Sequence, residues 1–122
     1  MTPFGRRVRE LRAERSITQK QMAADLGVSA AYLSALEKGY RGAPSWQFVQ
    51  RIITYFNIIW DDAEELQTLA RTSHPRVMVD TAGLSPEATE LANLLAACIG
   101  ELGQKDILAI IHEVRSRASR GK

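Results

Sequence analysis

The stretch Thr18–Lys38, TQKQMAADLGVSAAYLSALEK, decides the fold. Apolar residues recur at helical spacing on both sides of Gly27, and glycine suits the left-handed conformation of a tight turn. Ser29 follows the turn and is a residue type that caps helices. Two short helices joined in this way predict a helix-turn-helix, whose second helix can lie in the major groove of DNA. The apolar set is Ile17, Met22, Ala23, Leu26, Val28, Leu33 and Leu36.

The polar and glycine residues of this stretch also form a motif. It begins at Thr18-Gln19, continues through Met22-Ala23 and Gly27-Val28-Ser29, and ends with Glu37 and Gly39. This motif resembles that of the lambda-repressor-like (Cro and Xre) family of DNA-binding regulators. The resemblance implies a sequence-specific transcriptional regulator of double-stranded DNA. Repression by blocking polymerase is the default in that family, and activation is the alternative.

The helical pattern extends on both sides of the motif. Thr2-Pro3 predicts a capped first helix running to about Arg15, and Ser45 and Asp61 are the expected caps of two later helices. Gln21 would complete a capping box with Thr18. We therefore expect an all-α fold, with a five-helix lambda-repressor-like DNA-binding domain over residues 1–73.

The second helix of the motif, about Ser29–Lys38, is the expected recognition helix. Its positions at Ala30, Ala31 and Ala35 often carry long polar side chains in the similar family, whereas here they carry only methyl groups. Specificity would then come from other residues, from the following loop, or from DNA shape. Tyr32 has a packing role as its alternative. The candidate DNA-binding residues are Gln19, Ser29, Ala30, Ala31, Tyr32, Ser34, Lys38, Tyr40 and Arg41.

Two roles follow from the resemblance residue by residue. Arg12 and Glu37 stand at the spacings at which an Arg and a Glu form a structural ion pair in similar proteins. Gln19, just inside the second helix, would present its amide to a DNA phosphate. Arg6 and Arg9 are weaker phosphate candidates, with a solvated helix face as the alternative.

After Ser73 the pattern changes. Residues 74–84 read as a linker in which Val77–Val79 is strand-like, either paired with a second copy or packed on helices. Residues 85–122 predict a C-terminal helical hairpin, with its second helix at about Gln104–Arg117 and a frayed basic tail. Its apolar surface exceeds what an isolated hairpin can hide, so we expect a homodimer through residues 85–117. Cys98 is expected to be a buried, structural thiol.

The charges also differ between the first and second halves of the chain. Residues 1–56 hold nine Lys or Arg against four Asp or Glu, whereas the remainder holds seven against ten. A basic first half favours attraction to phosphates, and an acidic second half favours another task. The absence of a long apolar run predicts a soluble, cytoplasmic protein with no membrane span.

The composition also limits the chemistry. Neither of the two histidines, His74 and His112, belongs to a catalytic constellation, and no phosphate-binding loop, dinucleotide fingerprint or metal motif is present. We therefore expect no enzyme activity, cofactor, metal or small-molecule effector. The remaining alternative is an antitoxin-like or adaptor module whose C-terminal helices bind a different protein.

Overall fold

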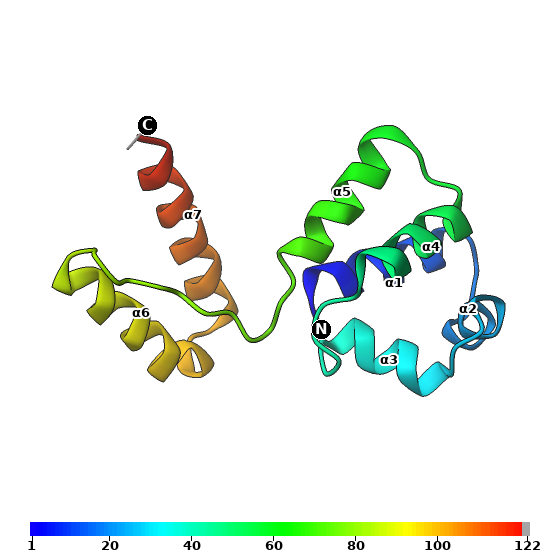
Figure 1. The fold of residues 1–122 in the computed structure, drawn as a ribbon, viewed down its shortest axis with the longest axis horizontal. Helices are drawn as coiled ribbons and strands as arrows, with labels where there is room; N and C mark the ends of the chain where they lie inside the picture. Colours follow the sequence, from blue (N-terminus) through cyan, green and yellow to red (C-terminus); the bar gives the residue numbers. More distant parts are fainter. Residues whose placement is uncertain (121–122) are drawn as a thin grey trace. The chain divides into compact units, whose positions relative to one another are not determined.

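The computed structural model describes residues 1–120, which form two compact units that divide between Val77 and Met78. The described residues are all-helical with no strand, which confirms the predicted fold class (Figure 1). The helices of the first unit are α1 (Pro3–Glu14), α2 (Gln19–Leu26), α3 (Ala30–Lys38), α4 (Trp46–Phe56) and α5 (Trp60–Arg71). Those of the second are α6 (Pro86–Cys98), the short 3-10 helix η1 (Ile99–Glu101) and α7 (Gln104–Arg120).

Side-chain caps set the starts of the first four helices. In each, a Ser or Thr hydroxyl accepts a hydrogen bond from the backbone N–H three residues later, as the sequence predicts; the caps are Thr2, Thr18, Ser29 and Ser45. Only half of the predicted capping box forms at α2, because the Gln21 amide donates to Asp25 (2.8 Å). The predicted cap of α5 is wrong. That helix begins at Trp60 without a side-chain cap, and Asp61 lies in its first turn, where a negative charge is still favourable.

The turn between α2 and α3 has the geometry of a helix-turn-helix. Gly27 adopts φ 74° and ψ 28°, a left-handed conformation that favours glycine. The next amide, that of Val28, donates to the carbonyl of Ala23 (2.9 Å), which satisfies one of the free carbonyls at the end of α2. The chain can therefore reverse direction and start α3 at once.

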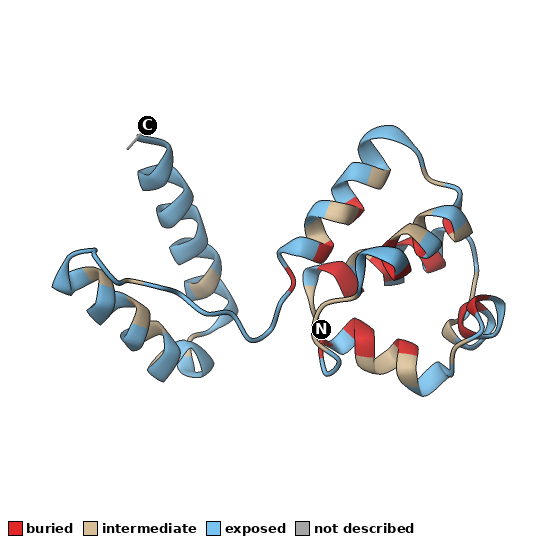
Figure 2. Cartoon of the chain, in the orientation of Figure 1, coloured by how far each residue is buried: buried red, intermediate tan, exposed pale blue. Residues whose placement is uncertain are grey.

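A single apolar core holds the first unit together. Figure 2 shows its buried residues on the inner sides of the helices. Every one of the five helices contributes, so the whole unit holds α3 in place. The core residues are Phe4, Val8, Leu11, Met22, Ala23, Leu26, Leu33, Leu36, Phe48, Val49, Ile52, Phe56, Leu66 and Ala70.

The start of α1 packs closely against the end of α3. The carbonyl of Glu37 accepts a hydrogen bond from the Thr2 amide (3.1 Å), and Gly5 faces the same carbonyl group. A Cβ at Gly5 would lie only 2.7 Å from the carbonyl carbon of Glu37. At the other side, the Ser73 hydroxyl accepts from the Phe4 amide (3.0 Å) and closes the unit just after α5.

The second unit has no comparable core. No residue of α6, η1 or α7 is buried, and α6 and α7 diverge from their connection (Figure 1). The predicted burial of Cys98 is therefore wrong, since this thiol is half-buried. The predicted fraying is also wrong for the described part of the tail, because α7 continues to Arg120. Residues 121–122 of the predicted C-terminal region lie outside the described residues.

The segment between the units is extended but forms no strand within the described chain. Val77, Met78 and Val79 are 74%, 91% and 62% exposed. Each of them therefore packs on no helix of its own unit. Their pairing with a second copy stays a prediction.

The close approach at Gly5 generates a stability prediction. Gly5→Ala should lower the free energy of unfolding by about 1–3 kcal/mol, because the new methyl group forces α1 away from α3. Urea unfolding followed by the fluorescence of Trp46 and Trp60, both in the first unit, measures this loss. Gly100→Ala is the control, since nothing lies within 4 Å of its added methyl group. Equal stability of the two variants would contradict the proposed packing.

Candidate nucleic-acid interface

One side of α3 belongs to the core and the opposite side faces outward. Leu33, Leu36 and Glu37 are buried. The candidate residues Ser29, Ala30, Ala31 and Lys38 are exposed, while Tyr32 and Ser34 are half-buried. The outward side of this helix is therefore mostly small, and its only exposed charge is Lys38 at the last turn.

Tyr32 takes part in packing at the edge of this surface. Its ring meets Phe48 edge-on, with the centroids 5.9 Å apart and the planes at 85°. The guanidinium carbon of Arg41 lies 5.5 Å from the Tyr32 centroid, in a cation–π arrangement. The ring thus positions Arg41, which comes from the loop after α3. Tyr40 in the same loop is 75% exposed and free to contact a partner.

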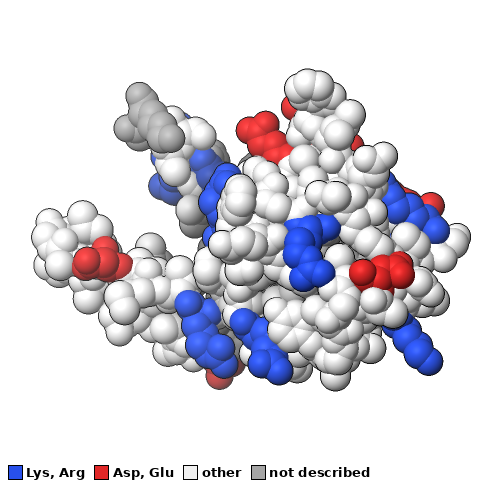
Figure 3. Space-filling view, turned by 45° about the vertical axis from the view of Figure 1, so that its right-hand side comes forward, with Lys and Arg blue, Asp and Glu red and all other residues white. Residues whose placement is uncertain are grey.

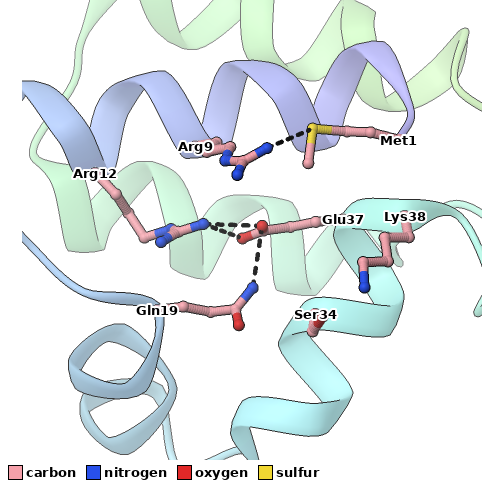
Figure 4. Close-up of a pocket in the computed structure, with 7 residues that line it drawn as sticks. All are labelled: Met1, Arg9, Arg12, Gln19, Ser34, Glu37 and Lys38. Atoms are coloured by element: carbon pink, nitrogen blue, oxygen red, sulfur yellow. Dashed lines mark hydrogen bonds and ion pairs between the residues drawn. The ribbon is translucent and has the colours of Figure 1, made fainter.

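The predicted pair of Arg12 and Glu37 is present and buried. One guanidinium nitrogen of Arg12, Nη2, lies 2.9 Å from Oε1 and 3.0 Å from Oε2 of Glu37. Gln19 joins this pair, because its side-chain amide donates to Oε1 of Glu37 (3.2 Å). Figure 4 shows the three side chains converging from α1, α2 and α3. The Gln19 side chain therefore has a structural partner in addition to the phosphate role expected for it.

Burial makes this cluster sensitive to the loss of either partner. It raises the pKa of the Glu37 carboxyl above its ordinary value, because a charged carboxylate is poorly solvated there. The Arg12 guanidinium and the Gln19 amide lower that pKa, since both stabilise the charged form. The Nε of Arg12 is itself buried without a hydrogen-bond partner. The pair thus orients three helices rather than adding a large net stability.

A polar cavity of about 340 Å³ lies beside this cluster (Figure 4). It brings three of the candidate DNA-binding residues together, namely Gln19, Ser34 and Lys38. Arg9 also borders it, whereas Arg6 does not. The grouping of Arg9 with Lys38 was missed by sequence reasoning, because α1 and α3 are far apart in the chain. Besides the paired Arg12 and Glu37, two further cations, Arg9 and Lys38, line the cavity, and α2 starts beside it at Gln19. These two cations and the helix start suit an anion such as a phosphate.

Helix α4 holds the end of α2 in place through two side-chain hydrogen bonds. Arg51 donates to the carbonyl of Leu26 at the end of α2, and Tyr55 donates to Asp25 (2.7 Å). Both contacts link α2 to α4 at the turn that precedes α3. Neither was predicted, since each joins residues at least 25 positions apart.

On the face drawn in Figure 3, cationic side chains are dispersed rather than continuous. In the view of Figure 3, Lys and Arg form separate patches divided by uncharged surface. Separate cations suit contacts with spaced phosphates, which position a protein on a duplex without reading its sequence.

A known protein family matches the part of the chain that contains these contacts. The family described as helix-turn-helix domain matches residues 3–66, which include α1 to α4 and the first half of α5. The chain belongs to this helix-turn-helix family. The match covers the turn at Gly27, the outward side of α3 and the buried Arg12–Glu37 pair.

Several curated proteins are similar to about half of the chain. The chain is 34% identical over 62 residues to the uncharacterized HTH-type transcriptional regulator RghRB of Bacillus subtilis, covering 51% of this chain and 45% of that protein. It is 38% identical over 61 residues to the HTH-type transcriptional repressor RghR of the same organism, covering 50% and 45%. It is 34% identical over 74 residues to the HTH-type transcriptional activator BcrR of Enterococcus faecalis, covering 58% and 36%.

The matched region spans less than half the length of each of these relatives. No solved structure matches the chain significantly. Within residues 1–120, no helix is long and apolar enough to cross a membrane. The same residues contain no group of three or more His, Cys, Asp or Glu side chains arranged to hold a metal ion.

The buried ion pair generates a second stability prediction. Glu37→Gln should lower the free energy of unfolding by about 3–5 kcal/mol, because it leaves the Arg12 guanidinium buried without a counter-charge. Urea unfolding with tryptophan fluorescence measures the change.

Glu14→Gln provides the matched control within the first unit. It removes the same charge from a pair with Arg7 whose glutamate side chain is 57% exposed, so the loss should stay below about 1 kcal/mol. Losses of similar size in the two variants would mean that burial does not determine the importance of the Arg12–Glu37 pair.

Proposed function

We propose that the chain is a sequence-specific, DNA-binding transcriptional regulator that inserts α3 into the major groove. The observation that carries this proposal is the outward side of α3, which is held by a helix-turn-helix and bordered by cations at Lys38 and Arg41. The names of the three relatives, all transcriptional regulators, support the same function.

Phosphate contacts would come from the rim of the polar cavity and from the loop after α3. Lys38 and Arg9 border the cavity together with Gln19, which is the first residue of α2. The free backbone N–H groups at that helix start favour a phosphate oxygen. Arg41, positioned on the Tyr32 ring, is the second anchor, on the other side of α3. Two separated anchors would fix the angle at which α3 enters the groove.

We propose that the second unit pairs with a second copy of itself. None of the described residues of this unit is buried, so it lacks the apolar core that small domains need and requires another surface to cover its helices. A groove of about 320 Å³ is lined by apolar residues of α6, η1 and α7 together with Leu102 and Arg115, which makes it a suitable docking site for a helix. Its apolar residues are Leu95, Ile99, Leu102, Ile107, Ile110, Ile111 and Val114.

The charges of this unit favour a second copy as the occupant. The segment from α6 to η1 carries three glutamates and no Lys or Arg, whereas the last turns of α7 carry Arg115, Arg117 and Arg120. In a two-fold dimer, the basic end of one α7 can face the acidic α6 of its partner. Such a homodimer would present two copies of α3 to half-sites about 10 base pairs, or one helical turn, apart.

Repression by occupancy is the proposed mode of regulation, because a dimer bound across a promoter excludes polymerase without any further contact. One relative is named a repressor and another an activator. The competing proposal is an antitoxin-like or adaptor module whose α6 and α7 cover a different protein. The exposed apolar residues of those helices support that reading as well.

The first test concerns DNA. The full chain should bind pseudo-palindromic promoter fragments more tightly than bulk DNA at physiological salt. Lys38→Ala should weaken binding to all sequences alike and reduce the slope of log K against log salt by about 1, because it removes a phosphate contact. Fluorescence anisotropy over a salt series measures both effects.

Lys105→Ala, an equivalent change in α7, is the control and should leave the salt slope unchanged. Equal affinity for every fragment and for bulk DNA would overturn the proposal of a specific regulator.

The second test concerns the assembly. The full chain should form a discrete homodimer in sedimentation equilibrium. Ile111→Asp should convert it to a monomer, because an aspartate in the apolar groove would be buried unpaired. Ser116→Asp, which adds the same charge at an exposed position of α7, should leave the dimer intact. A monomeric native chain would contradict self-association and favour the adaptor.

A further inference from the structure

Only short side chains occupy the outward side of α3 near its start. Ala30 and Ser34 lie one helical turn apart, as do Ala31 and Ala35, so the four residues form two adjacent rows. None of them extends more than one atom beyond its Cβ. They therefore cannot make the two-point hydrogen bonds by which longer side chains read guanine or adenine.

The polar candidate residues of α3 and its cap outside these rows are engaged or distant, and Tyr40 lies in the loop after α3. The Ser29 hydroxyl accepts from the Tyr32 amide (3.0 Å) as the helix cap. The Tyr32 ring packs against Phe48, with the Arg41 guanidinium on it. Lys38 is the last residue of α3, whereas recognition helices contact base edges mainly through their N-terminal residues. At the start of α3 the groups left to meet the bases are the methyl groups of Ala30 and Ala31, with the half-buried Ser34 hydroxyl one turn further along. The major groove offers one apolar group on a base edge, the C5-methyl of thymine.

We propose that α3 selects DNA by packing the methyl groups of Ala30 and Ala31 against thymine methyl groups. This inference rests on the proposed function and names its ligand as A·T-rich duplex DNA with thymines under the start of α3. Small side chains also let the helix backbone approach the groove floor closely, so the paired methyl groups leave water. Each methyl group buried in this way should contribute about fourfold in affinity.

The test uses a thymine analogue. Preferred sites are first selected with the full chain from a random duplex library at physiological salt. Each thymine of an enriched half-site is then replaced by deoxyuridine, which has the same base-pairing groups but no C5-methyl. Affinity, measured by fluorescence anisotropy, should fall about fourfold at each contacted thymine and stay unchanged when the replacement lies outside the half-sites.

A protein variant assigns the contact. With Ala31→Gly, deoxyuridine at the thymine facing residue 31 should no longer lower affinity, because the methyl pair is already incomplete. Ala13→Gly is the matched control: it alters an exposed alanine of α1, weakens a helix to a similar degree, and should keep the full deoxyuridine effect. Circular dichroism checks the folding of both variants. If Ala31→Gly does not fold, Ala31→Ser keeps the helix and should reduce the same effect.

The outcomes separate this inference from the function on which it rests. Enriched A·T-rich sites that lose affinity with deoxyuridine would support both. Enriched sites whose affinity is indifferent to deoxyuridine would overturn methyl readout while leaving the specific regulator intact, and DNA shape would then be what the protein reads. A selection that enriches no site would overturn the proposed function, and this inference with it.

Discussion

The position of α3 depends on contacts that converge on Glu37. Its carboxylate holds Arg12 of α1 and Gln19 of α2, and its carbonyl accepts from Thr2 and faces Gly5. Three helices therefore meet at one residue of α3. Because a buried carboxylate needs its counter-charge, alternative angles between these helices would leave a charge unpaired. The ion pair thus gives the unit a defined geometry, while the apolar core supplies most of its stability.

Much of the first unit could be predicted because its signals are local. Helix caps, the glycine at the turn and the apolar spacing each depend on residues within a few positions of one another. The Arg12–Glu37 pair was reached through a family resemblance instead. The link from Arg51 to Leu26 and the grouping of Arg9 with Lys38 were missed, because they arise only when distant helices pack. The start of α5 at Trp60 was also missed, since Asp61 offered a plausible cap that the backbone does not use.

The second unit shows a different limit of sequence patterns. The spacing of apolar residues indicated two helices with an apolar side each, and α6 and α7 have this character. A periodic pattern states which side of a helix avoids water, but it does not identify what covers that side. Both Cys98 and the basic end of α7 illustrate this limit. The thiol was expected to be buried and is half-buried, and the end was expected to fray and is helical to Arg120.

In many proteins the same residues both stabilise the fold and determine what the protein binds. The exposed alanines of α3 are a case in which these two properties would depend on different residues. Ala30 and Ala31 contribute to neither the core nor the Glu37 cluster, and exposed helical positions of this kind tolerate most replacements within about 0.5 kcal/mol of stability. Glutamine, arginine and lysine are good helix formers that could stand there without disturbing the fold. New binding preferences could therefore arise in few mutational steps, in evolution or in the laboratory, without compensating changes elsewhere in the unit.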